Sequence, residues 1–384
     1  MPPAATTNPR RTILAAVLAL CGTINLMVLG YILLRHPAIN ADFLGFWAYP
    51  RFTPLTAIYI PDAMMHFQQN LYPGYKSFYP YTYPPDFLLF CGWMRGLSYN
   101  AARALWLLSG LALFAAAGWA LLRKPAGVIA LLASPAALLC IILGQSSFFI
   151  SALLLGGLAA LPKRPILAGV LFGLLTLKPQ MGLLLPLLLL ARGEWRTIIA
   201  AALTAGLLVV TSSLVLPPAL WRLWLTSLPP IQQDYFNGGA NLNIMITPAA
   251  NLLHLGVAPH LAMAVQAFCT LATALLTWFS ARRGSYNMAV AVLLSAMFLA
   301  QPHAYAYDLT ALPAALILGL NRAPLWSQAL ALVLYLAPLL LLSPWPSAFL
   351  YAPPLALLLA ALTWLALQRR TGAESRHEPV PISI

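Results

Sequence analysis

Long apolar segments separated by short polar connections run through most of this chain. They are rich in Leu and Ala, as between Gly182 and Ala191, and lack the alternation of apolar and polar residues that a membrane β-strand shows. Because a helix satisfies its own backbone hydrogen bonds in lipid, the pattern predicts an all-α integral membrane protein with about 12 transmembrane helices. The apolar segments are 12–34, 101–122, 126–143, 147–161, 165–177, 180–191, 197–216, 260–281, 286–300, 308–320, 325–343 and 347–368.

Several of these segments are short for a span. Segments 147–161, 165–177, 180–191 and 308–320 fall below the roughly 20 residues that cross a bilayer at right angles. Either they include flanking polar residues, or they are broken helices that end inside the membrane. Because backbone that is not helical at membrane depth survives only where it lines a cavity, broken helices indicate a cavity that opens outward. The interrupted segment 85–97 lies along the outer surface or re-enters the membrane.

Composition and charge agree with a membrane location. The 384 residues are 61% hydrophobic and 8% charged, whereas soluble domains carry roughly 25% charged residues. The net charge of +13 does not indicate nucleic acid as a partner, because most of the 21 Lys and Arg residues lie in short connections or near the two ends. These cations are Arg10, Arg11, Arg123, Lys124, Lys163, Arg164, Arg192, Arg196, Arg282, Arg283, Arg322, Arg369, Arg370 and Arg376.

The positions of these cations predict the topology. If the segments alternate from a cytoplasmic N-terminus, every inner connection holds at least one of them, as expected for cytoplasmic loops. The outer side then has two long extracytoplasmic loops, 35–100 and 217–259, and both termini are cytoplasmic. The first segment is expected to remain as an uncleaved span. We predict one membrane domain, 1–368, and a disordered cytoplasmic tail, 369–384, in the cell inner (plasma) membrane.

Side chains capable of chemistry collect on the predicted outer side. Asp42 follows the first segment among aromatic residues, where a carboxylate can have a raised pKa and act as a general base. Its alternative role is that of a solvated loop acid. The stretch 71–85, which includes Tyr83, has five tyrosines and four prolines. It suits the face of a sugar or a lipid head group, although interfacial tyrosine is common in membrane proteins.

Two outer turns hold a polar side chain between apolar segments. Gln145 follows Gly144, and an amide is costly at membrane depth without a partner. A tight turn needs Gly and Ser in any case, so Gln145 is explained by either reading. Lys178 joins two short segments. It is a candidate for binding phosphate, or it extends to the lipid head groups.

Residues 301–308 read QPHAYAYD and open the tenth apolar segment. If the helix begins early, Tyr305 and Asp308 share a face at i,i+3, with His303 in the turn before them. Alternatively, Asp308 is an acid stabilised by the helix N-terminus, which leaves His303 unexplained. Zinc-hydrolase, serine-hydrolase and nucleotide motifs are absent, and the four cysteines lack metal-ligand spacing. We therefore expect no cofactor.

The order of these motifs resembles glycosyltransferase family 87. The shared motifs are the Asp-Phe at 42–43, Tyr-Pro-Pro at 83–85, Gly-Gln-Ser at 144–146, AGVLFGLLTLKPQ at 168–180 and PHAYAYD at 302–308. The similarity runs from about Asp42 to Pro313. The family consists of polyprenyl-phosphate-mannose-dependent α-mannosyltransferases of the GT-C superfamily.

This resemblance implies a GT-C-like fold that transfers a hexose, expected to be mannose, with inversion at the extracytoplasmic face. The implied partners are a polyprenyl-phosphate sugar donor, a glycolipid or glycan acceptor, and membrane lipids. Asp42 is expected to be the catalytic base, with Asp62 as its substitute. A monophosphate donor implies that no metal is needed. The expected donor phosphate-binding residues are Lys178 and His303, and the expected pocket residues are Tyr83, Gln145, Tyr305 and Asp308.

Two other classes of function are compatible with the hydropathy pattern. A secondary transporter or lipid-sugar flippase commonly has twelve spans with both ends inside. Transporters, however, place polar residues at the midplane of paired repeats, whereas here they gather on one side. A lipid-binding or assembly protein without catalysis has no need of Asp42. The motif order favours the transferase.

Overall fold

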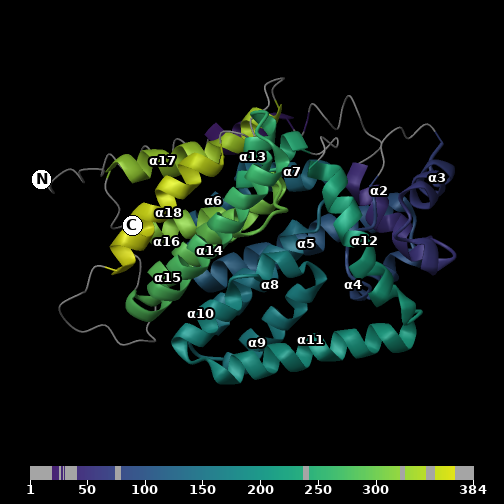
Figure 1. Cartoon of the computed structure of the whole chain (residues 1–384), viewed down its shortest axis with the longest axis horizontal. Helices are drawn as coiled ribbons and strands as arrows, with labels where there is room; N and C mark the ends of the chain where they lie inside the picture. Colours follow the sequence, from purple (N-terminus) through teal and green to yellow (C-terminus); the bar gives the residue numbers. More distant parts are fainter. Residues whose placement is uncertain are drawn as a thin grey trace, which may run out of the picture.

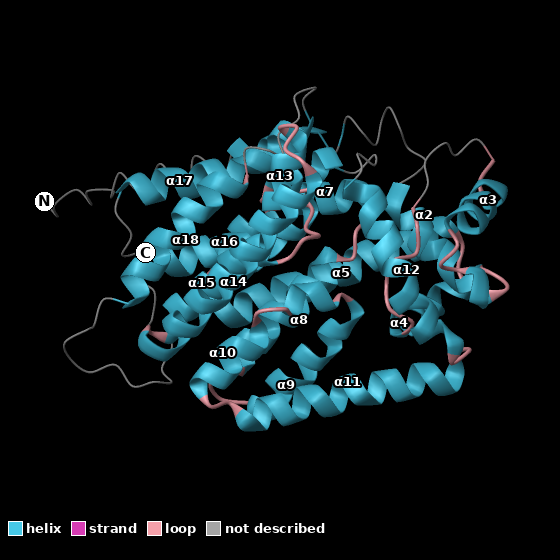
Figure 2. Ribbon diagram, in the orientation of Figure 1, coloured by secondary structure: helices cyan, strands magenta, loops and turns pink. Residues whose placement is uncertain are grey.

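The structure, a computed structural model, is helical throughout the part of the chain that it describes. The extended segments there form only an isolated bridge between Met245 and Tyr305, and Figure 2 shows helices joined by loops. The prediction of an all-α protein is confirmed. Most of the first apolar segment and all of the tail 369–384 lie outside the described residues. The structure describes residues 20–25, 27–28, 30, 41–73, 79–236, 242–320, 325–342 and 351–367.

Short helices precede the first long one and gather at one end of the molecule in Figure 1. Arg51 links two of these short helices, because its guanidinium donates to the carbonyls of Met94 and Leu97, each at 2.8 Å. A third bond from the same guanidinium reaches the carbonyl of Arg95 at 2.9 Å. Such charge-assisted bonds are stronger than neutral ones, so together they hold the Arg51 side chain in one orientation. The short elements are α2 (Ala41–Ala48), η1 (Tyr49–Arg51), η2 (Leu55–Ala57), α3 (Pro61–Leu71), α4 (Asp86–Cys91) and η3 (Gly92–Gly96), where η denotes a 3-10 helix.

The helices from α5 to α11 and from α14 to α18 follow the predicted apolar segments. They are α5 (Tyr99–Leu122), α6 (Pro125–Leu132), α7 (Pro135–Leu143), α8 (Ser147–Ala160), α9 (Pro165–Gly173), η4 (Leu174–Leu177), η5 (Pro179–Gly182), α10 (Leu185–Arg192), α11 (Trp195–Val215), α14 (Pro259–Arg283), α15 (Tyr286–Ala300), η7 (Ala306–Ala311), α16 (Leu312–Leu320), α17 (Leu325–Leu336), η8 (Ala337–Leu342) and α18 (Ala352–Leu367). By length and composition, α5, α11 and α14 qualify as membrane spans, and α6 with α7 adds a fourth if their 49° bend lies within one span. The other apolar helices are shorter, so the number of about 12 spans stays a prediction.

Proline and glycine set several helix boundaries. Pro135 occupies the first turn of α7, where its missing N–H breaks no helical bond. The same helix ends at Gly144, whose φ of 68° is a left-handed conformation that glycine adopts without strain. At the bend before α7, the Ala133 carbonyl oxygen accepts a hydrogen bond from the first apolar segment. The donor is the Asn25 side-chain amide, at 2.8 Å.

Helix α11 packs against α9 on one face and leaves its other face exposed. Leu203 and Leu207 are 69% and 65% exposed, and their spacing of four places them on one side. On the other side, Gly169 and Gly173 of α9 face the α11 backbone. A Cβ on Gly169 would lie 2.5 Å from the Thr197 carbonyl oxygen, so glycine alone permits this close approach. This packing fixes α9, whose end leads directly to Lys178.

The second predicted outer loop packs onto two motif segments. It contains α12 (Ala219–Phe236), η6 (Leu242–Ile244) and α13 (Pro248–His254). The Trp224 indole of α12 donates to the Thr82 carbonyl at 3.1 Å, beside Tyr83. The Ile246 amide donates to the Ala304 carbonyl at 3.0 Å, between His303 and Tyr305. The loop therefore helps to position both segments.

Candidate active site

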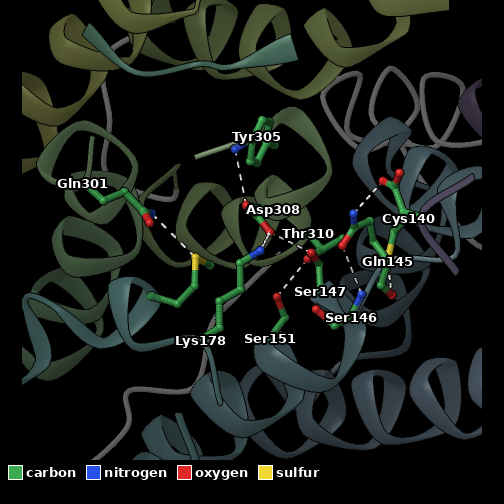
Figure 3. Close-up of polar contacts among 12 residues, drawn as sticks. Cys140, Gln145, Ser146, Ser147, Ser151, Lys178, Gln301, Tyr305, Asp308 and Thr310 are labelled. Atoms are coloured by element: carbon green, nitrogen blue, oxygen red, sulfur yellow. Dashed lines mark hydrogen bonds and ion pairs between the residues drawn. The ribbon is translucent and has the colours of Figure 1, made fainter. Parts of the chain in front are cut away.

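Four segments that are distant in the sequence meet at one polar centre. They are the start of α2 with Asp42, the turn after α7 with Gln145, the junction of η4 and η5 with Lys178, and η7 with Asp308. Figure 3 shows the Lys178 and Asp308 side chains directed toward each other from different elements, with Gln145 near Ser146 and Ser147. The predicted alternation places all four segments on the same side of the membrane. The 3-10 helices η4 and η5 lie on each side of Lys178, in agreement with the interpretation of the short segments as broken helices.

Asp42 receives a short hydrogen bond at this centre. The Gln145 amide nitrogen donates to Asp42 Oδ2 at 2.6 Å and to the Tyr79 hydroxyl oxygen at 3.1 Å. Burial raises the pKa of Asp42 to about 6, while the bond from Gln145 and the charge of Lys178 act in the opposite direction. A carboxylate with such a pKa is ionised at neutral pH and still basic enough to accept a proton.

Lys178 and Asp308 form a buried ion pair. Lys178 Nζ lies 2.5 Å from Asp308 Oδ1, and the two side chains are 4% and 1% exposed. Ser147 Oγ donates to the same oxygen at 2.7 Å. Lys178 therefore does not extend to the lipid head groups, and that alternative is wrong. A buried pair of this kind is stable only when each charge has close partners, which both residues have here.

The early start of the tenth helix is confirmed in its essentials. Tyr305 is the N-cap of η7, and its backbone N–H donates to Asp308 Oδ2 at 3.3 Å. One carboxylate thus caps the helix through one oxygen and holds Lys178 through the other. The Lys178 ammonium also lies 5.4 Å from the centroid of the Tyr307 ring, within the range of a cation–π contact. Asp308 therefore lies in the first turn of the helix, as the second interpretation expects, and its part in the pocket stays a prediction.

His303 lies at the edge of the centre. Its ring makes an edge contact with Tyr305 at 6.1 Å between centroids. Burial, together with the positive charge of Lys178, lowers the pKa of His303 to about 4. The imidazole is therefore neutral at physiological pH and offers one N–H donor rather than a second positive charge.

Tyr83 packs beside Gln145. Its hydroxyl lies 3.5 Å from Ser146 Oγ and 3.4 Å from the Tyr79 hydroxyl. Its ring stacks on Phe87 at 4.0 Å between centroids. The site residues that the sequence pointed to are thus brought together. Asp62, the substitute base, is exposed on α3, and no contact connects it to this group of side chains.

Several residues of the centre were not predicted from the sequence. Tyr79, Ser147 and Tyr307 each contact one of the predicted site residues. They stand in motif segments, yet nothing in their spacing separates them from the neighbouring tyrosines and serines. Among the described residues, no three His, Cys, Asp or Glu side chains lie close enough to hold a metal ion.

Chemically, the centre combines a buried carboxylate with a buried cation and several hydroxyl groups. Fold and site together define an all-helical membrane protein with a polar centre built from the connections between its helices. The sequence profile of glycosyltransferase family 87 matches residues 81–302, more than half of the chain. The chain belongs to this family and is a membrane glycosyltransferase, not a transporter. No curated protein and no solved structure matches it.

The matched range includes part of the centre. Tyr83, Gln145 and Lys178 lie within residues 81–302. Asp42 and Asp308 lie outside that range but contact Gln145 and Lys178 directly. The matched range and the polar centre therefore overlap in the sequence.

Proposed function

We propose that this protein transfers mannose from a polyprenyl-phosphate donor to a hydroxyl group of a glycolipid or glycan. One observation supports the proposal above all others: a base candidate and a buried cation belong to one connected centre. Asp42 binds Gln145 at 2.6 Å, and Lys178 binds Asp308 at 2.5 Å. Between them, the consecutive residues Gln145 to Ser147 connect the two pairs, because Ser147 donates to Asp308.

In the proposed reaction, Asp42 acts as the general base. The acceptor hydroxyl oxygen attacks the anomeric carbon of the donor sugar while its proton passes to the Asp42 carboxylate. A new bond forms between that carbon and the acceptor oxygen as the bond to the phosphate oxygen breaks. Direct displacement of this kind inverts the anomeric configuration. The raised pKa of Asp42 suits proton transfer near neutral pH.

Lys178 and His303 are proposed to bind the donor phosphate. Negative charge grows on the leaving polyprenyl phosphate as the sugar departs, and a fixed ammonium nearby stabilises it. The neutral imidazole of His303 adds a hydrogen-bond donor, and a bound phosphate would raise the pKa of that imidazole. Tyr83, Gln145, Tyr305 and Asp308 form the pocket. A monophosphate leaving group with these partners needs no metal ion.

The membrane arrangement that accompanies this function is also proposed. About 12 spans in a GT-C-like order, with cytoplasmic termini, place the centre at the extracytoplasmic face of the inner (plasma) membrane. The meeting of four connections from the predicted outer side supports this arrangement. A lipid-linked donor reaches such a centre from within the bilayer, whereas a nucleotide sugar remains in the cytoplasm.

The test replaces the Asp42 carboxylate with an amide of nearly the same size, which cannot act as a base. Membranes or purified protein carrying Asp42→Asn are assayed with radiolabelled polyprenyl-phosphate mannose and a membrane glycolipid extract. Loss of a general base lowers the rate by roughly 100- to 10,000-fold, so transfer should fall to the background level. Asp62→Asn is the matched control, since Asp62 is exposed on α3, and it should retain full activity.

Two results contradict the proposal. Full transfer by Asp42→Asn, with the same expression and thermal unfolding as wild type, removes Asp42 as the base. Transfer from a polyprenyl-phosphate donor that carries glucose, with no transfer from the mannose donor, would show that mannose is not the donor sugar. In the second case the phosphate-binding roles of Lys178 and His303 stand.

A further inference from the structure

The amide of Gln145 has a fixed orientation in the centre. Its two amide protons are directed to two acceptors, Asp42 Oδ2 at 2.6 Å and the Tyr79 hydroxyl oxygen at 3.1 Å. If the amide were rotated by half a turn, its carbonyl oxygen would face the Asp42 carboxylate and repel it. The Ser146 N–H, which donates to Gln145 Oε1 at 3.4 Å, and the Tyr79 hydroxyl oxygen, which accepts the second amide proton, support the orientation in which Gln145 donates to Asp42.

Tyr79 is itself held by its backbone. The Gln68 side chain on α3 donates from Nε2 to the Tyr79 carbonyl at 2.7 Å. Its Oε1 accepts from the Tyr79 amide at 3.1 Å. Gln68 is fully buried, so these two bonds are shielded from water. The position of the Tyr79 ring thus depends on α3 as well as on its own loop.

The Tyr79 ring also rests on the helix that carries Asp42. A Cβ on Gly45 would lie 2.6 Å from Tyr79 Cδ1 and 3.0 Å from Tyr79 Cβ. Only glycine allows the ring this close to the α2 backbone, three residues after Asp42. Phe46 makes an edge contact with the same ring, with 5.5 Å between centroids.

From these contacts we infer that Tyr79 is a positioning residue for Asp42, which it orients through the Gln145 amide and through α2. This inference rests on the proposed role of Asp42 as the base. The Tyr79 hydroxyl contacts the Gln145 amide, so Tyr79 acts on Asp42 through that amide. It holds the hydrogen bond that keeps the carboxylate ionised and directed into the centre.

The Tyr79 hydroxyl should affect how the rate of transfer depends on pH. The bond from Gln145 favours the ionised form of Asp42 and so opposes the effect of burial. Without the Tyr79 hydroxyl this bond weakens, the pKa of Asp42 rises further, and the acid limb of the rate moves to higher pH. The other ionisable groups that interact with Asp42 are Lys178 at the η4–η5 junction and Tyr307 on η7. Both remain unchanged in the variant.

The experiment measures kcat/KM against pH for purified Tyr79→Phe with a polyprenyl-phosphate mannose donor. We expect the acid limb to move up by at least half a pH unit, with activity about threefold lower at pH 5 and close to wild type at pH 8.5. Gly45→Ala, which pushes the ring away, should move the limb in the same direction. Tyr81→Phe is the control, because the Tyr81 hydroxyl donates to the Pro84 carbonyl and not to this network.

The outcomes separate this inference from the proposed function. If Asp42→Asn is inactive but Tyr79→Phe keeps the wild-type pH profile, Tyr79 is not a positioning residue, and Asp42 remains the base. A loss of activity that is equal at every pH also overturns the inference, since it points to a structural role alone. If Asp42→Asn is active, the proposed function itself fails.

Discussion

Lys178 is a residue whose candidacy is visible in the sequence and whose partner is visible only in the structure. A lone lysine between two apolar segments is visible in the sequence, and its position there made it a candidate. Its counter-charge was not visible, because Asp308 lies 130 positions further along the chain. The same holds for Tyr79, which only the folded chain brings to Gln145. Local sequence names the reactive side chains, whereas their partners depend on the tertiary fold.

The Lys178–Asp308 pair can be tested by breaking and then removing it. Asp308→Asn leaves the Lys178 ammonium buried without a counter-charge, and breaking a buried pair costs about 3–5 kcal/mol. Thermal unfolding in detergent should show this loss of stability. The double variant Lys178→Met with Asp308→Asn should recover most of the stability while remaining inactive. Equal unfolding temperatures of wild type and Asp308→Asn would show that the pair contributes nothing to folding.

The wild-type pH profile tests the environment of Asp42. Because its pKa is raised to about 6, the base is ionised above that pH and loses its function as the pH falls. We expect kcat/KM to be half-maximal near pH 6 and to fall about tenfold for each further pH unit of acidification. The measurement uses purified enzyme with a saturating acceptor. An acid limb near pH 4 would show that Asp42 is solvated, as the loop-acid interpretation requires.

For the helices, most of the apolar segments could be predicted, but their interruptions could not be placed. The sequence offered broken helices as one explanation of the short segments, and the 3-10 turns η4 and η5 around Lys178 agree with it. Segment 126–143 gave no such warning and is bent by 49° between α6 and α7. Hydropathy reports burial in lipid, whereas a bend depends on hydrogen bonds to the backbone, such as the one that the Asn25 side chain donates to the Ala133 carbonyl.

The packing of α9 on α11 gives a prediction for glycine. Gly173→Leu places a side chain where a Cβ already lies 2.7 Å from the Ala201 carbonyl oxygen. Overpacking of this kind costs about 1–3 kcal/mol, and α9 should also shift Lys178, five residues later. We expect a lower unfolding temperature together with reduced transfer. Gly206→Leu is the control, since nothing lies within 4 Å of its Cβ position. Similar losses in both variants would exclude a specific α9–α11 contact.

The whole molecule is arranged so that connections from one predicted side converge. The alternation of basic residues predicts that Asp42, Gln145, Lys178 and His303 lie on the same side. Their proximity in the folded chain agrees with that topology. The packing of the second outer loop on residues 301–308 was not predictable, because no periodicity marks Met245 or Ile246.

Sidedness can be measured with cysteine labelling in intact cells. Asp62 and Lys163 are both exposed, and the topology puts them on opposite sides of the membrane. In a background where Cys269 is replaced by Ser, a membrane-impermeant maleimide should label Asp62→Cys in intact cells. It should label Lys163→Cys only after permeabilisation. The other native cysteines, Cys21, Cys91 and Cys140, are buried. Labelling with the reverse preference would overturn the predicted orientation.

The backbone bond between Ile246 and Ala304 makes the second outer loop part of the wall that carries His303. A loop attached in this way must break this bond, or carry the segment with His303 along, before it can swing aside. Insertions near residue 245 should accordingly impair sugar transfer before they affect insertion of the helices into the bilayer.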